Sequence, residues 1–248
     1  MELFYAFPPH IDRAAGRIRL EGDEFHHLAR VLRKKPGERI AVTDGSGLHA
    51  DVCITSVGKT ALEGDILTEW MVERSPSSVT VAISLLKAPH RFDFFLEKAT
   101  ELGVSAVIPM ITARTVAQPS GERIAKKLSR WKSVMLSAAR QSGRYYLPDI
   151  GEPLPFARVI GLQGYDCRLL PYERAGRHAL HPDFARRKSL FLIGGEGGFT
   201  SEEVRCAVDT GFTEISFGHS ILRAETAGIF AVALVRSRLL ELAENEWL

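Results

Sequence analysis

Two glycine-rich segments near the C-terminal end contain the residues best suited to chemistry. The first reads LIGGEGGFTSEEV (Leu192–Val204) and the second reads FGHSILRAETAGIFAV (Phe217–Val232). Each pattern predicts a buried strand, then a loop, then the start of a helix. Glycine lets a backbone approach a ligand closely, and neither segment contains a lysine. The two loops together therefore predict a pocket that holds a nucleoside-containing cofactor through backbone groups rather than through phosphate charge.

The familiar nucleotide and metal motifs are missing from the sequence. No GxGxxG follows a predicted strand, and neither HExxH nor GxSxG occurs. VGKT (Val57–Thr60) imitates the end of a phosphate-binding loop, but Cys53 stands where that motif needs glycine. The other two cysteines, Cys167 and Cys206, are far from Cys53 and from each other. We therefore expect no metal site and a reducing compartment.

The distribution of charge is more informative than the net charge of +2. Five basic residues stand between positions 30 and 39 against one acid, and eight stand between positions 114 and 144 against one acid. Such patches suit a phosphate backbone, although cations also solvate exposed helix faces. No apolar run approaches the roughly 20 residues of a membrane span, and the N-terminus does not resemble a signal peptide. A cytosolic protein is expected.

The first 74 residues read mainly as short strands separated by turns. The expected strands are Arg17–Leu20, Arg39–Asp44, Leu48–Val57 and residues 61–70. Their spacing predicts a small β-barrel or sandwich. One helix interrupts them, with Asp23 as its expected N-cap and Pro36–Gly37 as its expected end.

Beyond a Pro- and Ser-containing linker at Glu73–Ser78, strands alternate with helices. The expected strands are Val79–Leu86, Ala106–Met110, Cys167–Tyr172, Ser189–Gly194 and Thr213–Gly218. The expected helices are one that Gly103 ends, one that Ser120 caps, one that the capping box Thr200–Glu203 opens and Gly211 ends, and a last one over about 225–244. This alternation predicts an α/β layer structure with a mostly parallel sheet.

Five ordered motifs together resemble one known family. Besides the two glycine-rich segments they are FHHLARVLRKKPGERIAVTDGSG (25–47), EKATELGVSAVIPMITART (97–115) and RWKSVMLSAARQSGRYYLPDI (130–150). The chain resembles the bacterial 16S rRNA (uridine N3)-methyltransferases of the SPOUT superfamily. The resemblance implies a PUA-like RNA-binding β-barrel over 1–74 and a SPOUT α/β trefoil-knot domain over 75–248. It also implies S-adenosylmethionine as cofactor, a homodimer, and 16S rRNA, in the 30S subunit, as substrate.

The resemblance also implies particular site residues. The cofactor-binding residues would be Leu170, Pro171, Tyr172, Gly194, Gly195, Glu196, Gly197, Gly198, Phe217, Gly218, Ile221, Leu222, Arg223, Thr226 and Ala227. The two basic patches supply the residues expected to bind RNA, which are Arg30, Arg33, Lys34, Lys35, Arg114, Arg140 and Arg144. The chain departs from the family at Gly195, where proline is typical, and at His219–Ser220, where Pro-Arg is typical.

Methylation of uridine N3 sets chemical demands on the site. The N3 proton must leave, and negative charge develops on the ring carbonyls, which a cation or a backbone N–H group should stabilise. Arg223 is the expected cation, and Glu196 or Glu225 is the expected proton acceptor. Either glutamate could instead only fix loop structure or balance the positive charge of the cofactor sulfonium. Two other functions stay open, which are methylation of another RNA site and a non-catalytic role in ribosome assembly.

Overall fold

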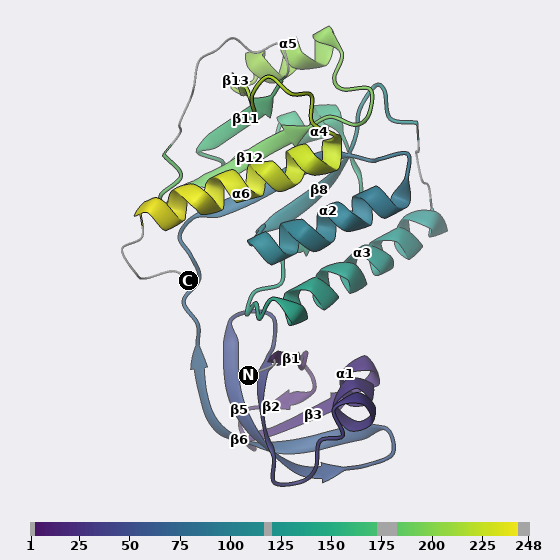
Figure 1. Cartoon of the computed structure of the whole chain (residues 1–248), viewed down its shortest axis with the longest axis vertical. Coiled ribbons are helices and arrows are strands. Elements are labelled where there is room, and N and C mark those ends of the chain that lie inside the picture. Colours follow the sequence, from purple (N-terminus) through teal and green to yellow (C-terminus); the bar gives the residue numbers. More distant parts are fainter. Residues whose placement is uncertain (1–2, 117–120, 173–182, 243–248) are drawn as a thin grey trace. The chain divides into compact units, whose positions relative to one another are not determined.

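The computed structural model describes residues 3–116, 121–172 and 183–242 (Figure 1). It divides into two compact units. The first contains residues 1–74 and 137–147, and the second contains residues 75–136 and 148–248. Ser120, which was expected to cap a helix, and the end of the last expected helix lie outside the described residues.

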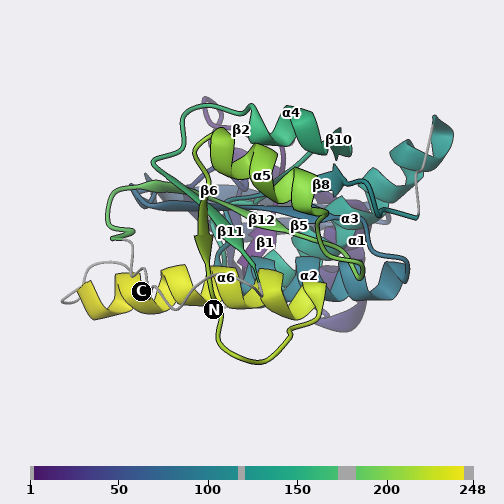
Figure 2. The same cartoon turned by 90° about the horizontal axis from the view of Figure 1, so that it is seen from above.

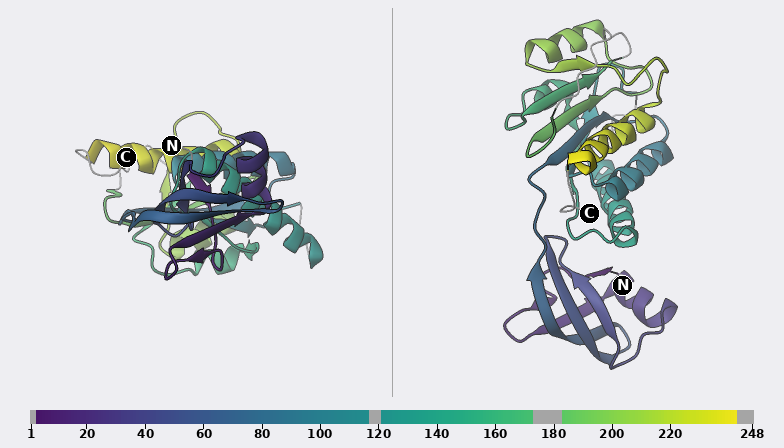
Figure 3. Two further views of the ribbon diagram at one scale, coloured as in Figure 1. Left: turned by 90° about the horizontal axis from the view of Figure 1, so that it is seen from below. Right: turned by 60° about the vertical axis from the view of Figure 1, so that its left-hand side comes forward.

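The first unit is built on a mixed six-stranded sheet with the order β1-β4-β5-β6-β3-β2. Its strands are β1 (Leu3–Tyr5), β2 (Ile11–Asp12), β3 (Arg17–Glu21), β4 (Arg39–Thr43), β5 (Leu48–Val57) and β6 (Ala61–Met71). The long strands β5 and β6 pair antiparallel side by side (Figure 3). Gly64 permits this pairing, because a Cβ atom there would lie 2.8 Å from the Cys53 carbonyl oxygen. The four strands expected from the sequence are confirmed, whereas β1 and β2 were missed.

The helix of the first unit differs at both ends from the sequence expectation. It consists of α1 (Gly22–His26) and a π-helical turn, η1 (His27–Val31). Asp23 is not the N-cap, because the chain already turns at Gly22, with φ 58°, and Asp23 lies within the first helical turn. The helix ends earlier than Pro36–Gly37. Arg33 already adopts a left-handed φ of 54°, and the Lys34 N–H donates to the Leu28 carbonyl (3.0 Å).

The second unit contains a seven-stranded parallel sheet with the order β10-β8-β7-β12-β11-β13, in which β9 also pairs with β8. Its strands are β7 (Ser78–Ser84), β8 (Ala106–Ile111), β9 (Asp149–Ile150), β10 (Leu154–Pro155), β11 (Cys167–Pro171), β12 (Lys188–Ile193) and β13 (Thr213–Ile215). The expected α/β architecture is therefore confirmed. Residues 189–193 of β12 are all buried, as expected for a central parallel strand whose two faces are both covered.

Helices cover both faces of this sheet. They are α2 (Pro89–Leu102), α4 (Phe156–Ile160), α5 (Ser201–Asp209) and α6 (Ala224–Leu242), while α3 (Glu122–Gln141) contacts α2 through Trp131 and Arg130. Helices α4 and α5 lie on one face, and α2 and α6 lie on the other (Figure 2). Gly228 lets α6 approach α2, since a Cβ atom there would lie 2.6 Å from the Phe95 ring.

Two helix boundaries in the second unit confirm the sequence reading. Gly103 ends α2 in a left-handed conformation, with φ 96°. At the start of α5 the Glu203 N–H donates to the Thr200 hydroxyl (3.1 Å), and the Thr200 N–H donates to the Glu203 carboxylate (2.9 Å). Both halves of the expected capping box are thus present. No helix in the described part of the chain is long and apolar enough to cross a membrane.

Candidate active site

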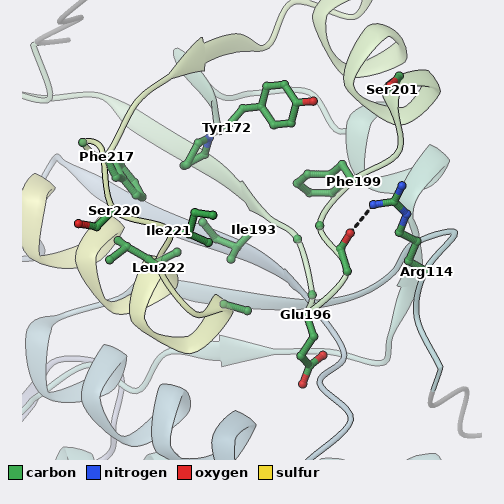
Figure 4. Close-up of a pocket in the computed structure, with 18 residues that line it drawn as sticks. Arg114, Tyr172, Ile193, Glu196, Phe199, Ser201, Phe217, Ser220, Ile221 and Leu222 are labelled. Carbon is green, nitrogen blue, oxygen red and sulfur yellow. Dashed lines mark hydrogen bonds between the residues drawn. The ribbon is translucent and has the colours of Figure 1, made fainter. Parts of the chain in front are cut away.

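A pocket of about 440 Å³ lies where β11, β12 and β13 end (Figure 4). This is the carboxyl edge of a parallel sheet, where loops from neighbouring strands meet and ligands commonly bind. The pocket is lined by Arg114, Pro171, Tyr172, Ile193, Gly194, Gly195, Glu196, Gly197, Gly198, Phe199, Ser201, Phe217, Gly218, Ser220, Ile221, Leu222, Ala224 and Ala227. Both glycine-rich loops contribute to it, although they are separate in sequence.

The loop after β12 is a tight turn that depends on glycine. The Gly198 N–H donates to the Gly195 carbonyl (3.0 Å), and Gly198 has a left-handed φ of 64°. A Cβ atom on Gly194 would lie 3.1 Å from the Gly198 backbone, and one on Gly195 would lie 3.1 Å from the Ser84 hydroxyl. The turn is therefore closed so tightly that its backbone, rather than its side chains, forms this wall of the pocket.

Arg91, at the start of α2, binds both of the glutamates expected to accept a proton. Its Nε and Nη2 donate to the two carboxylate oxygens of Glu225 at 2.8 and 2.6 Å, and its Nη1 donates to Glu196 at 3.1 Å. The Lys87 N–H also donates to Glu196 (3.2 Å). The sequence reading missed Arg91, because positions 91, 196 and 225 are far apart in the chain.

The electrostatics of this cluster disfavour Glu225 as a base. Burial raises the pKa of Glu225, but hydrogen bonds from Arg91 and from its own backbone outweigh burial and hold the pKa below the usual glutamate value. The hydrogen bonds to Glu225 in turn raise the pKa of Arg91. A carboxylate that is stabilised in its charged form is a weaker proton acceptor.

The structure brings most of the expected cofactor residues together, with three exceptions. Leu170 is fully buried in the core beneath the site, and Arg223 and Thr226 are exposed without lining the pocket. Glu225, which was expected to accept a proton, does not line the pocket either. Six lining residues were not among the expected cofactor-binding residues, namely Arg114, Ile193, Phe199, Ser201, Ser220 and Ala224, and all of them except Arg114 lie within the two glycine-rich segments. Ile193 ends β12 and Ser201 follows the helix-capping Thr200, so the extended strand and the capping box were the signals that could have identified them.

The residues expected to bind RNA fall into different environments. Arg30, Arg33 and Lys35 are exposed near the end of the helix in the first unit. Lys34 donates to Glu38 at 2.8 Å. Arg140 is half-buried and its Nε donates to the buried Glu24 at 2.9 Å.

Two further expected RNA-binding residues form hydrogen bonds with residues that are distant in the sequence. Arg144 is half-buried, and its carbonyl accepts a hydrogen bond from the Tyr5 hydroxyl. Arg114 is exposed in the second unit, and its Nη1 donates to the Gly197 carbonyl. Of the expected RNA-binding residues, Arg114 alone lines the pocket.

Comparison with known proteins shows which family this chain belongs to. A family model described as an RNA methyltransferase domain matches residues 73–236, and one described as an RNA methyltransferase PUA domain matches residues 20–67. The chain belongs to this RNA methyltransferase family. The resemblance read from the five sequence motifs is thereby confirmed, and so is the expected fold class, a PUA-like domain followed by a SPOUT-type α/β domain.

Relatives within the RNA methyltransferase family match nearly the whole chain. The ribosomal RNA small subunit methyltransferase E of Mycobacterium bovis is 33% identical over 222 residues, covering 87% of this chain and 84% of that protein. The crystal structure of the enzyme of the same name from Neisseria gonorrhoeae, bound to S-adenosyl methionine, is similar with a TM-score of 0.83 and 30% identity, covering 96% of this chain and 97% of that one. A putative methyltransferase from Legionella pneumophila with bound SAM has a TM-score of 0.84 and 25% identity, with coverage of 96% and 97%.

The donor set of the pocket suits such a cofactor. Apolar side chains and many backbone groups from three loops line the pocket. The charged side chains in its lining are the acidic Glu196 and the basic Arg114. Within the described residues, no group of three or more His, Cys, Asp or Glu side chains could hold a metal ion.

Proposed function

We propose that this protein transfers a methyl group from S-adenosylmethionine to N3 of a uridine in 16S rRNA. The observation that carries the proposal is the glycine-lined pocket at the carboxyl edge of the sheet, in a chain that belongs to an RNA methyltransferase family. The relatives named ribosomal RNA small subunit methyltransferase E support the choice of RNA. The N3 position follows from the family resemblance.

The two parts of the chain have separate roles in this proposal. Residues 1–74 form the RNA-binding module and residues 75–248 form the methyltransferase domain. We also propose a homodimer in the cytoplasm. Exposed apolar side chains at the pocket support the dimer. Ile221, which lines the pocket, is 82% exposed, and Phe230, whose ring centroid lies 4.8 Å from that of Phe217, is 42% exposed. Such patches commonly mark protein interfaces.

The pocket residues have defined tasks in the proposed reaction. When bound, the cofactor supplies an activated methyl group on a positively charged sulfur. The backbone of the loop at 194–198 and the residues after β11 hold the nucleoside part. The apolar side chains of Ile193, Phe217 and Leu222 exclude water. Glu196 and Glu225 stay bound to Arg91 and fix the two loops rather than accept the N3 proton.

Cofactor binding and product mapping test this function. Calorimetry with the purified protein should show S-adenosylmethionine binding. Small ribosomal subunits from a strain that lacks the gene should gain N3-methyluridine in 16S rRNA when protein and cofactor are added. Binding without transfer to any RNA would favour a non-catalytic assembly factor, and transfer to a different RNA would show that the target is wrong.

Reversing the exposed charges of the first unit should weaken RNA binding without changing cofactor affinity. We choose Arg30, Arg33 and Lys35 for replacement by glutamate, and leave Lys34 because it already pairs with Glu38. The logarithm of the RNA association constant falls as the logarithm of the salt concentration rises. For each phosphate that a variant no longer neutralises, this slope should become less steep by roughly 0.7–0.9. Filter binding over a salt series measures the slope, and Lys59→Glu, an exposed lysine in the turn after β5, is the matched control. Equal loss of cofactor binding would mean that the variants are misfolded.

A further inference from the structure

One residue that lines the pocket has a positively charged side chain. Among the described residues lining the pocket, Arg114 is the sole cation. Its Nη1 donates to the Gly197 carbonyl, and a Cβ atom on Gly197 would lie 3.1 Å from the Arg114 Cδ. The stem of Arg114 therefore packs along the glycine loop and holds the guanidinium at the pocket wall (Figure 4). A guanidinium has five N–H donors, and the bond to Gly197 uses one of the nitrogens.

The backbone on both sides of Arg114 is anchored to the second unit. The Ala113 N–H donates to the Glu203 carboxylate (2.8 Å), which also closes the capping box of α5. On the other side, the Thr115 hydroxyl accepts from the Thr112 N–H (2.8 Å) and contacts the buried Ser84 hydroxyl (2.9 Å). These hydrogen bonds fix the backbone at Arg114 before any substrate binds. Preorganised donors of this kind stabilise developing charge most effectively.

Other charged groups near the site are placed less favourably. Arg223, the cation expected from sequence, is exposed and does not line the pocket. Arg91 is bound by two carboxylates, Glu196 and Glu225. In Figure 4 the carboxylate of Glu196 points away from the ring of Tyr172 and from the labelled apolar side chains of the pocket.

We infer that Arg114 is the catalytic residue that stabilises the deprotonated uracil, an inference that rests on the proposed function. The uridine N3–H bond breaks and its proton goes to solvent hydroxide or water. The negative charge spreads onto the ring carbonyl oxygens, to which the Arg114 N–H groups donate. N3 then attacks the methyl carbon, the carbon–sulfur bond breaks with its electron pair going to sulfur, and the sulfonium becomes a neutral thioether.

The pH dependence of a single turnover tests this role. The rate should rise with pH as N3 ionises in the bound substrate. In Arg114→Gln, the loss of the guanidinium should lower the rate at neutral pH by about 10²- to 10³-fold. The rise should also move to higher pH by about two units, because one unit of pKa corresponds to a tenfold change in the population of the ionised form. Arg114→Lys, which keeps the positive charge, should recover part of the rate.

Matched variants separate this role from others. Arg205→Gln, an exposed arginine on α5 outside the pocket, should leave the profile unchanged. Calorimetry should give each variant the wild-type affinity for S-adenosylmethionine, and a tenfold loss in Arg114→Gln would overturn the inference by showing that Arg114 binds the cofactor. A lower rate with an unshifted pH profile would also overturn it, as would a shifted profile in Arg223→Gln but not in Arg114→Gln. Failure of the wild-type protein to methylate the particles would instead reject the proposed function.

Discussion

Replacing Arg91 by methionine is expected to lower the free energy of unfolding by about 2–3 kcal/mol, because a buried carboxylate loses its hydrogen-bonding cation. The Glu225 side chain is 8% exposed, and Arg91 supplies two hydrogen bonds to it. Methionine keeps much of the apolar stem but no donor. The cofactor affinity should also fall, because Arg91 joins Glu196 of the glycine loop to Glu225 at the start of α6. Each 1.4 kcal/mol of binding free energy lost corresponds to a roughly tenfold lower affinity.

The sign of the pH effect follows from the pKa of Glu225, which is lowered in the folded protein. A carboxyl with a lowered pKa stabilises the fold above its unfolded pKa of about 4.3 and loses that contribution as pH falls through the folded pKa. In Arg91→Met, only the hydrogen bond from the Glu225 backbone and the charge of Arg223 still oppose burial, so the pKa of Glu225 should be higher than in the wild type. The difference in unfolding free energy should therefore be largest near neutral pH and should shrink on acidification through this range.

Urea unfolding at several pH values measures the effect of Arg91→Met. Arg205→Met is the control, because it removes an arginine from an ion pair with Glu202 whose side chains are 68% and 64% exposed. Exposed pairs contribute about 0–1 kcal/mol, so this variant should unfold almost as the wild type does. If Arg91→Met were equally stable at neutral pH, the Arg91–Glu225 pair would not stabilise the contact between α2 and the start of α6.

Replacing Gly194 by valine is expected to weaken cofactor binding while leaving the core intact. A Cβ atom at this position would lie 3.1 Å from the Gly198 backbone and 3.3 Å from the Phe199 ring, so the turn must open. Overpacking of this kind costs about 1–3 kcal/mol, which corresponds to roughly 5- to 150-fold lower affinity if the cost falls on the binding-competent loop.

Calorimetry with S-adenosylmethionine measures this loss of affinity. The matched control is Gly151→Val, because the Cβ position of Gly151 meets no atom within 4 Å. Wild-type affinity in Gly194→Val would show that the loop after β12 does not need its closed turn to bind the cofactor.

Local patterns in the sequence predicted most elements of the fold because hydrophobic periodicity and capping act over short distances. The alternation in LHADVCITSV predicted β5 at Leu48–Val57, and Thr200 with Glu203 predicted the start of α5. The same reading placed the helix cap of the first unit wrongly at Asp23, since it could not see that Gly22 turns the chain one residue earlier. The two-residue strands β2, β9 and β10 were also missed, because such short segments show no period.

By itself the sequence determined the family, the α/β class and the two glycine loops, because each is written in contiguous residues. Only the tertiary structure decided which charged groups meet. Arg91 pairs with Glu225 across 134 positions of sequence, and Arg114 reaches Gly197 across 83. No local pattern encodes such pairs, since the fold of the parallel sheet brings distant strand ends to one edge. The glycine loops therefore predicted a pocket, whereas the assembled sheet showed which cation lines it.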